Sequence, residues 1–147
     1  MKYLKITTTA IALFFLAACG GNKKLQAGEI INKDLNGEWQ FVKMYANTDS
    51  MLFTTAKEFI RFDTEKKSVS GKASCNGFFG SFTGGGNQIK MGPIGSTMMA
   101  CANLDTENRM KKGLETIDNW LVIGNKLYLK NGAATIFELD WKDKKTE

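Results

Sequence analysis

The stretch "NKLYLKNGAATIFELDW", residues 125–141, predicts a β-hairpin near the C-terminus. Its second half, residues 134–141, alternates between two sets of side chains with the two-residue period of a strand. Residues 126–130 form the preceding strand, and Asn131-Gly132 between the two is a strong short-range signal for a hairpin turn. Residues 120–123 add one more short strand, so the C-terminal third is expected to consist of hairpins.

Further strands are expected upstream. "LNGEWQFVKMY", residues 35–45, is aromatic and alternates with a period of two, whereas Asn47–Thr55 reads as a polar loop. "KEFIRFD" then supplies a second strand that ends at Asp63. Glycines punctuate the shorter strands that follow and are typical of bulges and sharp bends, which curl a sheet into a barrel. These shorter strands are expected at residues 68–74, 79–83 and 88–91, and an Asn76-Gly77 turn is expected beside Cys75.

One helix is predicted within "LDTENRMKKGLETIDNWL", residues 104–121. Its apolar side chains recur at helical spacing, so that one stripe faces a core; they are Met110, Leu114, Ile117 and Leu121. Asp105 or Thr106 can cap the helix start, Glu107 suits the positive end of the helix dipole, and Gly113 permits a close approach to the sheet. The fold class is therefore mainly β (α+β): a strongly curved antiparallel sheet or partly open β-barrel, with one helix closing an end.

The N-terminus has the pattern of an export signal. Lys2 and Lys5 precede an apolar stretch that is too short to span a bilayer, and Leu16-Ala17-Ala18-Cys19 resembles the lipobox of bacterial lipoproteins. Cleavage before Cys19 would leave that residue to carry the lipid. The alternatives are an ordinary secretory signal with an incidental cysteine, or an anchored helix. The expected organisation is a signal peptide (1–18), a lipidated flexible tether (19–33), one domain (34–142) and a polar tail (143–147).

The basic charge of the chain is partly a property of this leader. Loss of Lys2 and Lys5 lowers the formal net charge from +5 to +3, and the remaining basic residues are scattered, with no arginine-rich stripe. This favours a solvated charged surface over binding to nucleic acid. Gly20 after the cysteine offers no inner-membrane retention signal of the enteric aspartate type, which favours the outer membrane.

The cysteines exclude several kinds of chemistry. The chain has no histidine, which rules out a Cys–His nucleophile and a Ser–His–Asp triad. With Cys19 under lipid, two thiols are too few for a structural zinc site. In an exported domain Cys75 and Cys101 favour a disulfide, which would contribute roughly 3.5 kcal/mol on the chain-entropy model. Reduced buried thiols remain an alternative, as does a soft Cu(I) site with Met98 and Met99.

The combined motifs resemble a known family. "GKASCNGFFGSF" is followed by "GPIGSTMMAC", by the helix with Glu107 and Leu114, and by "NKLYLKNGAATIFEL". This order is similar to that of the META domain, also called the HslJ-like or DUF306 family, of bacterial envelope and heat-shock-associated proteins. Ser74 stands where the commonest form of the motif has glycine. The resemblance implies a small β-rich fold without established enzymatic activity, linked in general terms to stress and drug tolerance.

These observations favour a non-enzymatic envelope lipoprotein that acts as a binding or structural module, without cofactor or metal. Its contacts are the membrane, through the lipid, and an unknown envelope protein, with Phe78 and Phe79 as candidate surface rings unless they fill the core. A carrier of a small apolar ligand inside the barrel is the alternative. An enzyme that uses paired carboxylates is disfavoured, because the candidates occupy turns, a helix start or outward strand faces; they are Asp63, Asp105, Glu107, Glu138 and Asp140.

Overall fold

The computed structural model describes residues 34–46, 49–53, 57–100 and 104–142. Within these ranges the chain forms nine strands and one helix, in the order ββββββαβββ. The elements are β1 (Gly37–Ala46), β2 (Asp49–Leu52), β3 (Phe59–Asp63), β4 (Ser68–Ala73), β5 (Asn76–Thr83), β6 (Lys90–Ser96), α1 (Asp105–Thr116), β7 (Asn119–Ile123), β8 (Lys126–Asn131) and β9 (Ala134–Trp141).

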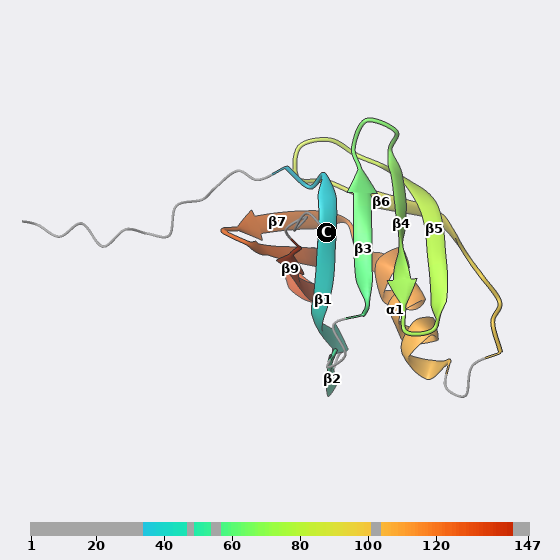
Figure 1. Ribbon diagram of the computed structural model, residues 1–147. Coiled ribbons are helices and arrows are strands. Elements are labelled where there is room, and N and C mark those ends of the chain that lie inside the picture. The colour runs from blue at the N-terminus through green and yellow to red at the C-terminus, as the bar shows by residue number, and fades with distance from the viewer. Residues whose placement is uncertain (1–33, 47–48, 54–56, 101–103, 143–147) are drawn as a thin grey trace, which may run out of the picture.

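The strands form one antiparallel sheet that curves into a half-barrel (Figure 1). Their spatial order is β6-β5-β4-β3-β1-β9-β8-β7, and β2 pairs with the end of β1. The register shifts at three places, between Phe41 and Lys43, between Gly80 and Phe82, and between Leu129 and Lys130. Such irregularities bend and twist a strand, which gives the sheet its curvature. The predicted fold class is confirmed.

The two edges of the curved sheet meet at one point. Gln88, in the connection between β5 and β6, forms an isolated antiparallel bridge with Asn119 of β7. On either side of this bridge, the Ile89 N–H donates to the Asp118 carbonyl at 3.0 Å and the Trp120 N–H to the Asn87 carbonyl at 2.9 Å. The half-barrel is therefore closed by backbone hydrogen bonds at this seam.

Helix α1 packs on the buried face of the sheet, where Met110 and Leu114 are fully buried. Gly113 makes the close approach possible: a Cβ atom at this position would lie 2.6 Å from Cζ of Phe137 on β9 and 3.0 Å from Cε of Met44 on β1. A larger side chain would have to push the helix away from the sheet. The expected role of Gly113 in close packing is confirmed.

Three strand predictions need correction. The expected polar loop contains β2, whose residues pair with Lys43–Ala46 of β1. The strand expected at residues 88–91 begins at Lys90 and continues to Ser96, and Pro93 is tolerated because β6 lies at an edge of the sheet. The expected Asn76-Gly77 turn is also wrong: Ala73 pairs with Asn76, so the turn residues are Ser74 and Cys75.

The helix is shorter than its apolar stripe suggested. It ends at Thr116, and Ile117 is already extended, so Leu121 lies on β7 and is exposed. Asp105 and Thr106 lie within the helix, and the residue at the N-cap position is Leu104, without a side-chain capping bond. At the other end, the Asn131 side-chain amide donates to the Thr116 carbonyl, so a bond from β8 stabilises the exit from the helix.

In β1 the two-residue alternation stops halfway. Trp39 and Phe41 are buried as expected, but the bulge after Phe41 shifts the register, and Met44 rather than Lys43 takes the next buried position. A single additional residue reverses the face to which all later side chains point. The core of β1 therefore combines residues from both of the alternating sets in the sequence.

Candidate functional site

Four segments converge at one end of the half-barrel, which we call the distal end because it lies opposite Asp34 (Figure 1). They are the hairpin of β1 and β2, the turn between β4 and β5, residues 97–99, and the start of α1. The Thr106 hydroxyl donates to Sδ of Met51 at 3.8 Å, and Arg109 lies 3.6 Å from Asp49, so these contacts join α1 to β2.

Asn76 holds the distal end together. Its side chain is buried and uses both of its polar atoms: Nδ2 donates to Oε2 of the buried Glu107 at 3.0 Å. Oδ1 accepts from the Thr97 hydroxyl at 2.9 Å and from the Met99 backbone N–H at 2.8 Å. We call Asn76, Thr97, Met99 and Glu107 the asparagine clamp, because one amide joins β5, the segment after β6 and the helix.

Backbone bonds reinforce the clamp. The Gly77 N–H donates to the Thr97 hydroxyl at 3.1 Å, and the Thr97 N–H donates to the Gly77 carbonyl at 3.0 Å. Two segments of the motifs identified in the sequence, Asn76-Gly77 and Thr97–Met99, are thus neighbours in space. Their polar residues serve the architecture of the distal end: a buried amide and carboxylate each gain a hydrogen-bonding partner.

The turn that carries Cys75 has an unusual backbone. Ser74 has φ of +57°, in the left-handed region that favours glycine. Ser74 therefore adopts, with a β-carbon, a backbone conformation that glycine adopts without steric cost. Cys75 is half-buried, whereas Cys101 and Cys19 lie outside the described residues. The Cys75–Cys101 pair and the lipid on Cys19 therefore stay predictions.

Large apolar side chains are exposed at the distal end. Met98 is 97% exposed and Met99 60% exposed, so neither fills the core. Leu52 on β2 and Leu104 at the helix start are exposed as well. Exposed apolar side chains thus occur on three segments of the distal end, and we call these four residues the apolar cluster. Single exposed leucines are common in proteins, whereas contiguous apolar patches are typical of interaction surfaces.

The two candidate surface rings have different positions. Phe78 is only 3% exposed and belongs to the core, so its assignment to a partner surface is wrong; the strand alternation turns it inward. Phe79 is 60% exposed, and its ring lies over Gly95 of β6, where a Cβ atom would approach Cε2 to 2.8 Å. A surface role therefore stays a prediction for Phe79 alone.

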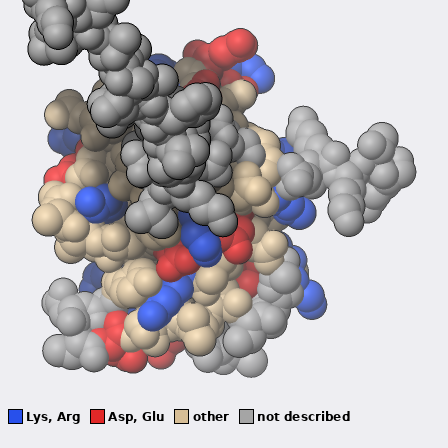
Figure 2. Space-filling model, turned by 90° about the vertical axis from the view of Figure 1, so that its left-hand side faces the viewer, with Lys and Arg blue, Asp and Glu red and all other residues tan. Residues whose placement is uncertain are grey.

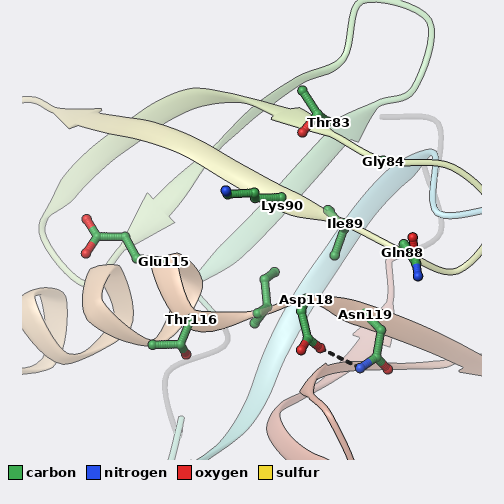
Figure 3. Close-up of a pocket in the computed structure, with 10 residues that line it drawn as sticks. Thr83, Gly84, Gln88, Ile89, Lys90, Glu115, Thr116, Asp118 and Asn119 are labelled. Atoms are coloured by element: carbon green, nitrogen blue, oxygen red, sulfur yellow. Dashed lines mark hydrogen bonds between the residues drawn. The ribbon is translucent and has the colours of Figure 1, made fainter.

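A groove runs along the seam of the half-barrel, with a volume of about 570 Å³ (Figure 3). Glu115 lies at one end, and Gln88 and Asn119 at the other. Of its two acidic residues, Asp118 has structural partners: one carboxylate oxygen accepts from the Asn119 side chain at 2.6 Å and from the Gly132 N–H at 2.9 Å. The groove is open and is lined by polar as well as apolar side chains, unlike the enclosed apolar cavity that a carrier of apolar ligands needs.

The carboxylates considered for acid–base chemistry have structural partners. On β9, Glu138 and Asp140 accept from Lys126 at 2.7 and 3.1 Å. The hydrogen bond from Lys126 lowers the pKa of Glu138 against the opposing effect of burial. The backbone N–H of Lys66 lowers the pKa of Asp63. Groups that are held ionised in this way are poor proton donors near neutral pH.

Charged side chains of both signs are mixed on the face shown in Figure 2, without a region of a single sign. In the described part of the chain, no three histidine, cysteine or acidic side chains gather in a way that could hold a metal ion. The same residues contain no helix that is long and apolar enough to cross a membrane.

Sequence reasoning missed the asparagine clamp. The sequence interpretation of Glu107 is a favourable interaction with the helix dipole and a disfavoured acid–base role, and that of Asn76 is a turn residue. The available signal was the combination of a carboxylate on the buried side of the helix and an asparagine that directly follows a cysteine of the motif. Only the fold shows that these residues, 31 positions apart, form a hydrogen bond.

The fold is similar to those of solved structures, and the sequence matches a known family. The fold is similar to an NMR structure of a protein from Burkholderia xenovorans, with a TM-score of 0.59 and 20% identity, over 74% of this chain and 83% of that one. It is also similar to the crystal structure of a DUF4847 family protein from Bacteroides vulgatus, with a TM-score of 0.53 and 13% identity, over 75% and 95% of the two chains. No curated protein matches the sequence. Residues 33–142 match the META domain family, and the chain belongs to that family.

Proposed function

We propose that this META domain protein is a non-enzymatic lipoprotein of the bacterial cell envelope, which uses its distal end to bind an envelope protein. The observation that carries the proposal is the position of the exposed apolar cluster. Its four residues, Leu52, Met98, Met99 and Leu104, are exposed, and the segments that carry them lie at the opposite end of β1 from the point where the chain from Cys19 enters the domain (Figure 1).

The dimensions agree with this arrangement. Residues 20–33 between the lipid and the domain span at most roughly 50 Å when extended, and about 20 Å as a flexible coil. The ten residues of β1 place the distal end about 33 Å beyond the domain entry. A relaxed tether would therefore keep the domain entry near the membrane and turn the apolar cluster away from it, towards proteins of the envelope.

A disulfide between Cys75 and Cys101 is part of the proposal. The hydrogen bond from Met99 N–H to Asn76 fixes the chain two residues before Cys101 next to the residue after Cys75. Two further Cα–Cα steps of about 3.8 Å give Cys101 enough reach for a disulfide, in which the Cα atoms are roughly 4.4–6.8 Å apart. The disulfide would covalently reinforce the asparagine clamp.

Site-specific photocrosslinking in intact cells tests the binding role. A photoreactive amino acid at Met98 or at Leu52 is expected to give one discrete adduct, since both side chains belong to the exposed cluster. The same probe at Ile123 is the matched control, because this side chain is exposed and apolar but lies on β7 away from the distal end. Adding Leu52→Glu to the Met98 probe is expected to abolish the adduct, because it buries a charge in the interface.

Equal yields from Met98 and Ile123 would contradict the proposal, as would an adduct that persists in the Leu52→Glu variant. Both outcomes would show that capture does not depend on the apolar cluster.

A further inference from the structure

Five of the six described methionines fall into two groups. Met44, Met91 and Met110 belong to the buried core. Met98 and Met99 are adjacent in sequence and are the two most exposed. Between these groups, Met51 is half-buried, and its sulfur accepts a hydrogen bond from Thr106.

This separation has a chemical consequence. Oxidation of methionine requires contact between the oxidant and the thioether sulfur, so susceptibility follows exposure. Core methionines are protected as long as the domain stays folded. Met98 in particular is almost as accessible as in an unfolded chain.

The described hydrogen bonds between this segment and β5 are made by backbone groups and by the Thr97 hydroxyl. The Met99 backbone N–H and the Thr97 hydroxyl both donate to the Asn76 side chain. The Thr97 backbone N–H donates to the Gly77 carbonyl. A chemical change at the tips of the two methionine side chains therefore leaves these hydrogen bonds in place. It changes the polarity of the surface without breaking the clamp.

We propose that Met98 and Met99 form an oxidation site for two-electron oxidants such as hypochlorous acid, and that its oxidation converts the distal end from apolar to polar in the folded domain. In the reaction the thioether sulfur loses two electrons and forms a bond to the oxygen of the oxidant. The oxygen–chlorine bond breaks, chlorine leaves as chloride, and the proton is released to water. The product is methionine sulfoxide, a polar side chain.

Peptide mapping by mass spectrometry tests the site. The full-length chain is treated with increasing, substoichiometric hypochlorous acid, and the added oxygen is located and counted at each methionine. We expect oxidation at Met98 and Met99 to be on the order of tenfold faster than at Met44, Met91 and Met110. In denaturant the same treatment is expected to give similar rates at all five positions, because the fold alone creates the difference. Similar rates in the folded protein would overturn the proposal.

Two measurements on the oxidised protein test the second half of the proposal. Its thermal midpoint is expected to stay within about 3 °C of the untreated protein, as for most surface substitutions. Its retention on a hydrophobic column is expected to fall, and treatment with methionine sulfoxide reductases to restore it. The double variant Met98→Leu, Met99→Leu is expected to keep its retention after oxidation. A large fall in the thermal midpoint, or unchanged retention of the oxidised wild type, would contradict the proposed change of surface.

The oxidation experiment requires no binding partner. A positive result together with absent crosslinking at Met98 would therefore refute the binding role and leave the oxidation site standing.

Discussion

Replacing Asn76 with alanine is expected to reduce the free energy of unfolding by about 3 kcal/mol, which corresponds to roughly 10–20 °C in the thermal midpoint of a domain of this size. The substitution removes three hydrogen bonds at once. The Met99 N–H can form a hydrogen bond with water instead, because that residue is exposed. The carboxylate of Glu107, in contrast, is left buried without its amide partner. An unsatisfied buried charged group accounts for most of the loss.

Related substitutions separate the contributions that the individual hydrogen bonds of the asparagine clamp make to the free energy of unfolding. Glu107→Gln keeps an oxygen that accepts from Asn76, so its cost in the free energy of unfolding is expected to be much smaller than that of Asn76→Ala. Thr97→Val removes a single hydroxyl, and its cost should lie between those of the other two variants. Asn87→Ala, at an exposed asparagine in the loop before β6, is the matched control and should be close to neutral. Urea denaturation measures all four. A cost for Asn76→Ala no larger than that of Asn87→Ala would show that the clamp contributes nothing to the fold.

Replacing Gly113 with leucine is expected to cost at least about 3 kcal/mol, because its first side-chain atom would already overlap Phe137. Three further carbon atoms would have to enter a region that Phe137 and Met44 fill. The helix can accommodate them only by moving away from the sheet, which would loosen the packing of Met110 and Leu114 as well.

The alanine variant is the sharper test of this contact. In an exposed helix, Gly→Ala stabilises by about 1 kcal/mol through helix propensity. At Gly113 this gain should be absent or reversed, because Cβ would lie 2.6 Å from the ring of Phe137. Lys112→Leu is the control for the leucine variant, since it introduces the same side chain on the exposed side of α1. Stabilisation of the Gly113→Ala variant by the full propensity gain would contradict the close packing. Thermal unfolding monitored by circular dichroism provides these comparisons.

The parts of the fold that sequence predicted well are those set by local patterns. β9 was predicted with its observed boundaries because of its alternation. The predicted Asn131-Gly132 turn before it is wrong by one residue: Asn131 belongs to β8 and pairs with Ala134, so the turn residues are Gly132 and Ala133. β2 was missed because "DSML" carries no strand pattern of its own and exists through its pairing with β1. The far end of β6 was missed because two glycines and a proline resemble a loop.

The exposed apolar surface at the distal end was harder to predict from the sequence, for a physical reason. Whether Met98 and Met99 fill the core or face solvent depends on where the segment after β6 passes the sheet, which non-local hydrogen bonds to Asn76 decide. The same holds for Phe78 and Phe79: alternation shows that they point in opposite directions, but only the register with β4 and β6 determines which of them is inside.

The proposal of a lipid-anchored domain with a reinforced distal end requires that the three cysteines have different chemical states. Cys19 would carry the lipid, while Cys75 and Cys101 would form the disulfide next to the asparagine clamp. These states have different masses and different reactivities toward alkylating reagents, so a single preparation from membranes distinguishes them.

Mass spectrometry of the full chain, alkylated and digested without reductant, is the most direct measurement. We predict that residues 1–18 are absent, that Cys19 is the N-terminal residue and is acylated, and that the peptides containing Cys75 and Cys101 are linked until reductant is added. An unacylated Cys19, or alkylation of both Cys75 and Cys101 without reduction, would contradict the account.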